Sequence, residues 1–367
     1  MSVNYYNIYG LKEVINASGK MTILGVSTVS DRIVAAQKFG GQHFFEMADL
    51  IEKTGQYVAR LLKTEDAHVV SCASAGIAQG VAALIGRGCE RHLHQPYNTH
   101  IAPKREIILP KGHNIDYGAP IELMIAQGGG QLIEAGYANE CHEAHIERMI
   151  TPQTAGILYV KSHHTVQKNM LSPSAAVALA KKHQLPVIID AAAEEDLFTY
   201  TQLGAELVIY SGAKALNGPS SGLVLGKSPY VGWVRQQGKG LGRSMKVGKE
   251  NILGLVEALE AYLQTPKETG EQMKKRLAPF VERINQIHGL MAQVVQDGSG
   301  RDIYRASVKA VGFVDAKTIV AKQKETSPAI YTREYQVNQG IIEYDIRAVD
   351  EAGLDQIIQR LKEIVGQ

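Results

Sequence analysis

The chain has 367 residues, which at about 150 residues per domain corresponds to two domains. Hydrophobic residues make up 45% of the chain and charged residues 21%, so the composition is that of a folded globular protein and excludes a mainly disordered one. The 39 Lys and Arg residues nearly balance the 37 Asp and Glu residues. A net charge of +2 is too small to indicate binding to nucleic acid or to an anionic membrane.

The sequence carries no signal that directs it to or across a membrane. No run reaches the roughly 18 consecutive apolar residues of a membrane span, and the first residues lack a basic stretch followed by an apolar one. The three cysteines, Cys72, Cys89 and Cys141, are too few and odd in number for a disulfide framework. We therefore expect a cytoplasmic globular protein.

Residues 46–249 alternate short apolar runs with helical patterns, and we expect them to form the larger domain. Helices are predicted at 75–86 and 172–184. The expected strands are 67–74, 105–110, 130–136, 155–162, 186–193, 207–214 and 221–228. Runs of Val, Ile and Leu that alternate with helices predict an α/β fold with a mostly parallel central sheet covered on both faces.

The pattern changes after residue 249, where we expect a smaller α+β domain with a largely antiparallel sheet. The predicted elements are helices at 250–264, 270–289 and 350–366 and strands at 302–313, 329–337 and 340–349. Residues 1–45 do not share the rhythm of the large domain. We expect them to pack with residues 250–367 or to cross to a second subunit.

Polar residues at the carboxyl ends of the predicted strands are the candidates for a site, because parallel α/β sheets bind ligands there. Ser74, Ala75 and Gly76 form a small-residue junction between a strand and a helix, which suits an anion. A turn chosen only for tight packing explains these residues equally well, and no GK[ST] follows to make a P-loop. His113 follows the strand at 105–110, although a lone histidine is more often a surface or core residue.

Two charged residues follow neighbouring strands. Asp190 ends an apolar run, where its carboxylate needs a cation or a hydrogen-bond donor unless it merely caps a helix. Lys214 follows the next apolar strand, 24 residues later, and partial desolvation there would lower the pKa of its amine and make it a nucleophile. A surface lysine on a loop is the alternative. In chain order, the sequence thus offers an anion-binding turn at residues 74–76, the planar ring of His113, the acid Asp190 and the amine of Lys214. This is the set of groups that pyridoxal 5′-phosphate (PLP) requires for its phosphate, ring, ring nitrogen and aldehyde.

Three segments carry a resemblance that covers nearly the whole chain. SGAKALNGPSSG (211–222), VINASGKMTILG (14–25) and AIYTREYQVNQGIIEYDIR (329–347) resemble motifs of the selenocysteine synthase-like group of fold-type I PLP enzymes. The chain departs from the group's pattern at Ala213, where an acidic residue is usual, and at Asn217, where a Gly is usual. The resemblance implies a PLP-dependent transferase-like fold with a smaller α+β domain, and a homodimer or larger homo-oligomer.

The resemblance also implies roles for individual residues. Lys214 would bind the aldehyde of the cofactor and act as the catalytic base, and Asp190 would pair with its ring nitrogen. The remaining implied contacts are Ala192 below the ring, His113 on its other face, Ser74, Ala75, Gly76 and Ser211 at the phosphate, and Arg333 at the substrate carboxylate.

The group's branch that acts on small molecules fits better than the branch that acts on tRNA. The N-terminal motif begins within 20 residues of the start, and the net charge gives no tRNA footprint. We therefore expect α,β-elimination, with loss of water and ammonia, from a phosphorylated 2-amino-3-hydroxy sugar acid. Lys20 and Arg243 are candidates for binding the substrate phosphate, as are Lys246 and Lys249; a solvated basic loop is the alternative for each.

Other functions remain open at this point. A selenocysteine synthase-like transferase, an aminotransferase, or a cysteine or cystathionine lyase uses the same cofactor, and a non-catalytic protein could have kept the fold. A desulfurase needs a cysteine in the last third of the chain, and none is there. We expect no metal site, because the histidines near Cys141 and the pair His92 and His94 lack paired ligand spacing. His163 and His164 could contact substrate or lie on the surface.

Overall fold

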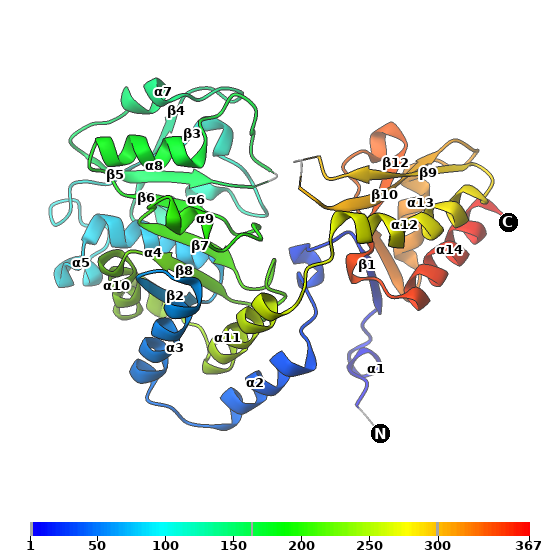
Figure 1. The fold of residues 1–367 in the computed structure, drawn as a ribbon, viewed down its shortest axis with the longest axis horizontal. Coiled ribbons are helices and arrows are strands. Elements are labelled where there is room, and N and C mark those ends of the chain that lie inside the picture. Colours follow the sequence, from blue (N-terminus) through cyan, green and yellow to red (C-terminus); the bar gives the residue numbers. More distant parts are fainter. Residues whose placement is uncertain (1–2, 163, 299–300) are drawn as a thin grey trace. The chain divides into compact units, whose positions relative to one another are not determined.

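The computed structural model describes residues 3–162, 164–298 and 301–367 and divides into two compact units. The larger unit is Ser27–Thr265, and the smaller one combines Met1–Val26 with Pro266–Gln367 (Figure 1). The larger unit thus extends beyond the expected 46–249. The reason is that α2 (Asp31–Gln42) packs on α11 (Lys249–Gln264), so closely that a Cβ on Gly40 would lie 2.8 Å from the Glu250 Cα.

A seven-stranded sheet forms the centre of the larger unit. Its strands follow the order β2-β8-β7-β6-β5-β3-β4, and only β8 runs in the direction opposite to the other six, so the prediction of a mostly parallel sheet is confirmed. The strands are β2 (Asp66–Val70), β3 (Glu106–Pro110), β4 (Gln131–Ala135), β5 (Thr154–Val160), β6 (Val187–Asp190), β7 (Leu207–Ser211) and β8 (Gly222–Gly226).

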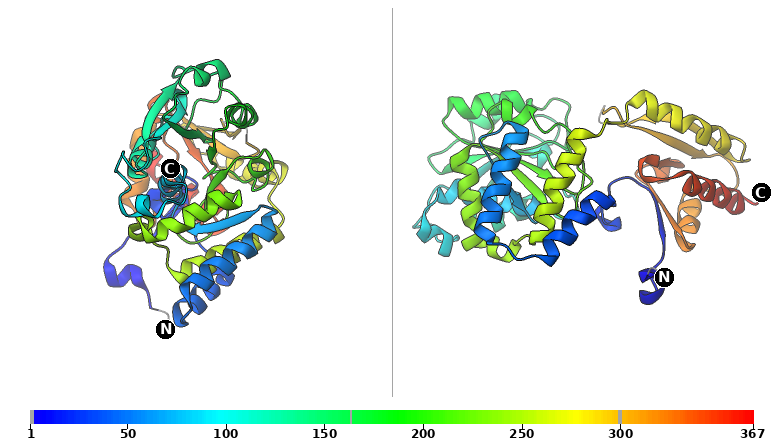
Figure 2. Two further views of the ribbon diagram at one scale, coloured as in Figure 1. Left: turned by 90° about the vertical axis from the view of Figure 1, so that its left-hand side faces the viewer. Right: turned by 60° about the horizontal axis from the view of Figure 1, so that its bottom comes forward.

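Helices cover both faces of this sheet, as Figure 2 shows. Successive strand residues alternate between the faces, so Ile189 packs in the core under one set of helices and Ile188 in the core under the other. The first set is α3 (Met47–Leu62), α7 (Glu143–Glu147), α8 (Pro173–Lys182), α9 (Thr199–Gln202) and α11. The second set is α4 (Ala73–Gly86), α6 (Ile121–Gln127) and α10 (Ser228–Gln236). Because both faces are buried, the central strands β5, β6, β7 and β8 are largely apolar, whereas the edge strand β4 is partly exposed and carries Gln131 and Glu134.

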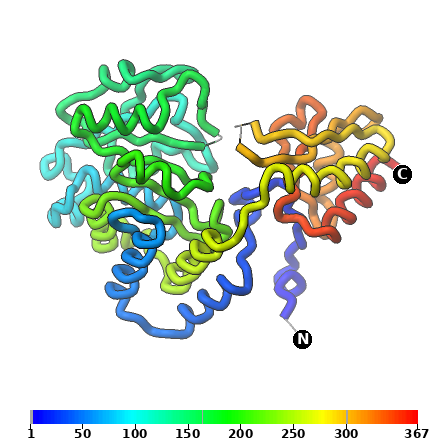
Figure 3. Tube along the Cα trace, viewed as in Figure 1, coloured from blue at the N-terminus to red at the C-terminus, as the bar shows by residue number. Residues whose placement is uncertain are grey.

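The smaller unit has an antiparallel sheet and a separate parallel pair of strands. The sheet has the order β12-β10-β9, and β1 (Val14–Ala17) pairs with β11 (Ala329–Thr332), so the N-terminal segment lies beside the C-terminal one (Figure 3). The sequence did not predict β9 or α13. The remaining elements are β9 (Leu290–Gln296), β10 (Tyr304–Ala310), β12 (Ile341–Tyr344), α12 (Gly270–Asn285), α13 (Ala316–Glu325) and α14 (Glu351–Val365).

The helices described in the structure are all too short or too polar to cross a lipid bilayer.

Candidate active site

Asp190 and Lys214 follow two neighbouring parallel strands of the larger unit. Asp190 is the last residue of β6 and lies opposite Ile209 of β7. Lys214 lies in the turn that begins directly after Ser211, the last residue of β7. Because parallel strands end at the same edge of a sheet, the turn brings the lysine to the edge where the carboxyl lies, as the spacing predicted.

The Asp190 carboxyl is almost completely buried, with 7% of the residue exposed, and its Oδ1 accepts a hydrogen bond from the Ala192 N–H at 3.0 Å. Burial raises the pKa of Asp190 to about 6, and the carboxylate of Glu194 acts in the same direction. The Ala192 hydrogen bond and the charge of Lys214 oppose that rise. The lysine and the acid are therefore electrostatically coupled.

The backbone around Lys214 is held on both sides by hydrogen bonds. The Gly212 N–H donates to the Ser221 carbonyl at 2.9 Å, and the Ser27 hydroxyl donates to the Ala213 carbonyl at 2.8 Å. Asn217 has φ +50°, in the left-handed region that Asn tolerates better than most residues. The departure from Gly at this position thus keeps the conformation that the turn needs.

The first turn of α4 offers two backbone N–H groups to a ligand. The Cys72 Sγ caps the helix by accepting from the Ala75 N–H at 3.3 Å. Among the described residues, the N–H groups of Ala73 and Ser74 have no hydrogen-bond acceptor. A Cβ on Gly222 would lie 2.6 Å from the Cys72 carbonyl carbon and 2.8 Å from the Ala73 nitrogen, so only glycine leaves room for this turn against β8.

Gly76 contacts the sheet rather than this ligand space. Its N–H donates to the Cys72 carbonyl at 3.1 Å, and a Cβ there would lie 3.0 Å from the Ile209 Cγ2. The expected phosphate contact of Gly76 has no support in this geometry, because the residue lets α4 pack closely on β7. The Ala75 N–H is likewise used, so Ser74 is the member of the predicted trio that keeps an available donor.

His113 is completely buried and exposes no ring surface. Its Nδ1 accepts from the Val160 N–H at 3.4 Å, and its ring meets that of Tyr159 edge-on, with centroids 4.6 Å apart. Burial, together with the charge of Lys161, lowers the pKa of His113 to about 4, so the ring is neutral at pH 7. Stacking requires an exposed face, so the role expected for His113 gains no support and stays a prediction.

Tyr117 lies at the site, and the sequence analysis did not select it. Its hydroxyl is 3.2 Å from the Ser74 hydroxyl, and its ring is half-buried. Burial raises the pKa of the Tyr117 hydroxyl and outweighs the hydrogen bond with Ser74, which lowers it; the charge of Asp190 acts in the same direction as burial. The available signal was position, because Tyr117 follows the same strand end as His113.

Two of the five candidate substrate-binding residues, Arg333 and Lys20, belong to the smaller unit. Arg333 forms an ion pair with Glu343, with an Nε–Oε2 distance of 3.4 Å, and its Cζ lies 5.1 Å from the centre of the Tyr335 ring. Burial lowers the pKa of the Arg333 guanidinium. Since Glu343 already holds Arg333, a substrate carboxylate would have to share or replace that partner.

Arg243 is exposed and lines a pocket of about 480 Å³ in the larger unit, together with His94 and Lys239. Lys249, by contrast, donates to the Gly41 and His43 carbonyls and so fixes the connection between α2 and α3. Of the two adjacent histidines, His164 is exposed and His163 lies outside the described residues.

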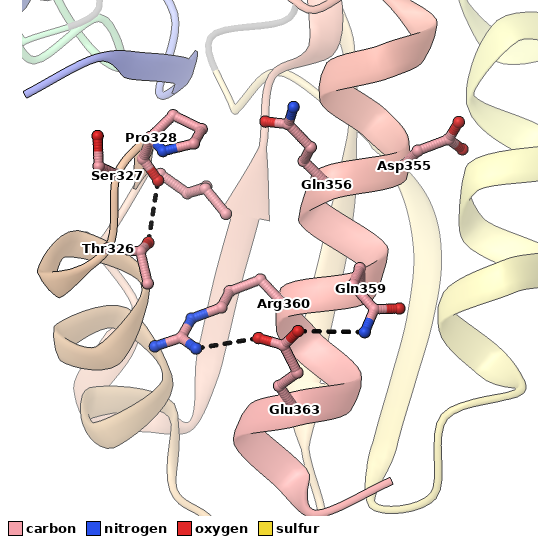
Figure 4. A pocket seen from close by; sticks show the side chains of 9 residues that line it. Thr326, Ser327, Pro328, Asp355, Gln356, Gln359, Arg360 and Glu363 are labelled. Carbon is pink, nitrogen blue, oxygen red and sulfur yellow. Dashed lines mark hydrogen bonds and ion pairs between the residues drawn. The ribbon is translucent and has the colours of Figure 1, made fainter.

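The smaller unit has a separate pocket of about 350 Å³ that contains none of the predicted site residues. Figure 4 shows it between α14 and the turn that leads into β11. Arg360 and Gln359 both donate to the Glu363 carboxylate there, and Thr326 donates to the Pro328 carbonyl. The charged side chains of this pocket thus already have partners, since Asp355 pairs with Arg283.

Comparison with known proteins places these features in a family. The family model of SelA, L-seryl-tRNA selenium transferase, matches residues 97–297. A D-glucosaminate-6-phosphate ammonia lyase from Salmonella typhimurium is 44% identical over 99% of this chain and 98% of its own length. A 5′-C-glycyluridine monooxygenase-decarboxylase from a Streptomyces species is 36% identical, over 98% of this chain and 92% of its own.

Solved structures agree with the fold. A structure of D-glucosaminate-6-phosphate ammonia-lyase matches with a TM-score of 0.93 and 43% identity, over 100% of this chain and 99% of that one. An aspartate aminotransferase from Thermotoga maritima matches with a TM-score of 0.55 over 99% of this chain and 94% of that one, and at 14% identity it supports the fold alone. The fold is that of fold-type I PLP enzymes, as expected.

Proposed function

We propose that this chain, which belongs to the SelA-like family together with the D-glucosaminate-6-phosphate ammonia lyase of Salmonella, is itself a PLP-dependent ammonia lyase that acts on D-glucosaminate 6-phosphate. The observation that carries the proposal is the coupling of Lys214 to the buried Asp190 at neighbouring strand ends. The identity of 44% over the full chain supports the substrate.

The residues present fit PLP. The N–H groups of Ala73 and Ser74 can hold its phosphate, at a turn that can pack against β8 only because residue 222 is a glycine. The Asp190 carboxyl can pair with a protonated ring nitrogen, because a cation nearby removes the cost of keeping that carboxylate buried and charged. Lys214 can bind the aldehyde. Bound PLP would supply an electron sink for the negative charge that develops when a proton leaves the substrate carbon next to the amine.

The chain's own residues would move the protons. The Lys214 amine takes the proton from C2 of the substrate and can return one to the 3-hydroxyl, which leaves as water. The enamine that remains takes up one water molecule and releases ammonia. The net change is loss of ammonia only, which gives 2-keto-3-deoxy-6-phosphogluconate.

We retain Arg243 as the predicted ligand of the substrate phosphate. The pocket that it lines contains the cationic side chains of Arg243 and Lys239 and the titratable His94, and no carboxylate lines it. This arrangement suits an anion. The roles of Arg333 and Lys20 at the substrate stay predictions.

We also propose that the chain forms a homodimer or a larger homo-oligomer. The apolar side chains of α1 (Tyr5–Tyr9) support this, because Tyr5, Ile8 and Tyr9 are 60%, 60% and 68% exposed. Clustered exposed apolar residues commonly mark an interface. Sedimentation velocity on the full chain tests the proposal, and a monomer at micromolar concentration would contradict it.

The function is tested by measuring release of keto acid and ammonia from D-glucosaminate 6-phosphate and from unphosphorylated D-glucosaminate, with and without oxygen. We expect equal amounts of keto acid and ammonia, no dependence on oxygen, and a marked preference for the phosphorylated compound. A reaction that stops without oxygen would instead favour the oxidative chemistry named for the Streptomyces relative.

A further inference from the structure

The loop that carries Tyr117 is folded back on itself and tied to the sheet. The Asp116 Oδ1 accepts from the Gly118 N–H at 2.7 Å, and Asp116 forms a β-bridge with Pro120. Gly118 has φ +109°, a conformation that side chains other than glycine's rarely adopt. At the start of the loop, the Asn114 side chain donates to Glu134 of β4 at 2.8 Å. These contacts fix the direction from which the Tyr117 ring approaches the first turn of α4.

The Tyr117 and Ser74 hydroxyls meet at that turn, 3.2 Å apart. Because burial raises the pKa of Tyr117, its hydroxyl keeps its proton at neutral pH and is available as a donor. Each hydroxyl has one proton, so in the pair one donates and the other's proton remains for a further acceptor. The Ser74 hydroxyl belongs to the same residue as one of the available N–H donors of that turn, so an anion bound there could accept from the N–H groups and from the one hydroxyl proton that the pair leaves available.

We propose that the Tyr117 hydroxyl, together with the Ser74 hydroxyl, binds the phosphate monoester of the cofactor and closes its binding site from the side opposite to β8. This inference rests on the function proposed above. Tyr117 is thus a cofactor-binding residue that the sequence analysis did not select. Its hydroxyl donates to the phosphate without taking part in proton transfer at the substrate.

The test compares binding of PLP and of pyridoxal, which has the same ring and aldehyde but no phosphate. Dissociation constants are measured by absorbance for the wild-type protein, Tyr117→Phe, Ser74→Ala and the double variant. Tyr97→Phe is the matched control, because it removes an exposed tyrosine hydroxyl that donates to the Gln127 carbonyl. Thermal unfolding of each cofactor-free variant is recorded alongside.

We expect Tyr117→Phe to weaken PLP binding by about tenfold or more, as loss of a hydrogen bond to a charged group does. Its affinity for pyridoxal and its melting temperature should not change, and Tyr97→Phe should bind both compounds like the wild type. The double variant should lose less than the product of the two single losses, because both hydroxyls act on one group.

Equal weakening of PLP and pyridoxal by Tyr117→Phe would overturn the inference, since the hydroxyl would then act on the ring or on the fold. Unchanged binding of both compounds would overturn it as well. In either case wild-type binding of PLP through Lys214 would leave the proposed function standing. A wild-type protein that binds neither compound would remove the proposed function and this inference with it.

Discussion

The Lys214 amine and the Asp190 carboxyl influence each other from the ends of adjacent parallel strands, and the carboxyl nevertheless has its pKa raised to about 6. Burial outweighs the attraction of the lysine. Asp190 is therefore an acid whose charged form needs a further cation. A protonated ring nitrogen would be such a cation, which gives the buried position of this carboxyl a chemical purpose within the proposed function.

Replacing Asp190 by Asn should stabilise the cofactor-free protein at alkaline pH. The folded-state pKa of about 6 exceeds the ordinary value of 3.8, so the stability that comes with the neutral acid is complete below 3.8 and is lost as the pH rises through 6. We expect Asp190→Asn to gain about 3 kcal/mol over the wild type at pH 8. Denaturant unfolding at pH 5 and pH 8 measures this; a gain that is the same at both values would contradict the assigned pKa.

The same substitution should remove activity after PLP is added, because Asn cannot hold the ring nitrogen in its protonated form. A variant that is more stable but inactive would show that the Asp190 carboxylate lowers the stability of the cofactor-free protein and is nevertheless required for the reaction. Retained turnover in Asp190→Asn would show that the acid is dispensable to the reaction.

Replacing Lys214 by Ala should abolish turnover and leave the fold intact, because hydrogen bonds of the Gly212 N–H and of the Ala213 carbonyl hold the surrounding turn. Reduction of the PLP-treated wild-type protein with borohydride should attach a pyridoxyl group to Lys214, which peptide mass spectrometry locates. Lys181→Ala, at an exposed position of α8, is the matched control and should keep full activity. Labelling of a different lysine would refute the assignment of Lys214.

Replacing Gly222 by Ala should displace the start of α4. The new Cβ would lie under 3 Å from backbone atoms of Cys72 and Ala73, which cannot move aside as a side chain can. We expect a loss of about 1–3 kcal/mol in unfolding free energy and weaker PLP binding. Gly232→Ala in α10 is the control, since a Cβ there meets nothing within 4 Å and should be neutral or stabilising. Equal melting temperatures and PLP affinities for the two variants would show that position 222 tolerates a side chain.

The smaller unit depends on a buried ion network around Asp345, which has no exposed surface and pairs with Arg305 at 3.2 Å and Arg347 at 2.8 Å. Burial alone would raise the pKa of Asp345, but the two arginines outweigh it and lower the pKa to about 2. The network's contribution is therefore present above about pH 4 and is lost as the pH falls through 2.

Asp345→Asn should consequently cost about 2–3 kcal/mol at pH 7, the free energy that corresponds to a pKa lowered from 3.8 to about 2, while Asp297 stays paired with Arg305 at 2.8 Å. Asp355→Asn is the control, since that carboxylate is exposed and its pair with Arg283 should contribute less than about 1 kcal/mol. Denaturant unfolding followed by circular dichroism measures both. Similar losses for the two variants would mean that the buried network adds nothing beyond a surface pair.

The order of strands and helices in the larger unit, and the positions of Asp190 and Lys214 at strand ends, could be predicted from the sequence because they depend on local patterns. Apolar runs that alternate with helical periods define a buried parallel sheet, and a charged residue directly after such a run lies at its edge. The β9 strand was missed because its burial alternates irregularly and the preceding helix pattern ran on beyond Asn285.

Side-chain exposure, by contrast, was decided by the tertiary structure alone. His113 and Tyr117 follow the same strand, yet packing against Tyr159 buries the first and a turn at Gly118 brings the second to Ser74. Gly76 looked like a ligand-binding glycine until its neighbours in β7 and β8 were known. Such contacts join segments that are far apart in the chain. A local sequence pattern therefore cannot predict which side chains these contacts will bury.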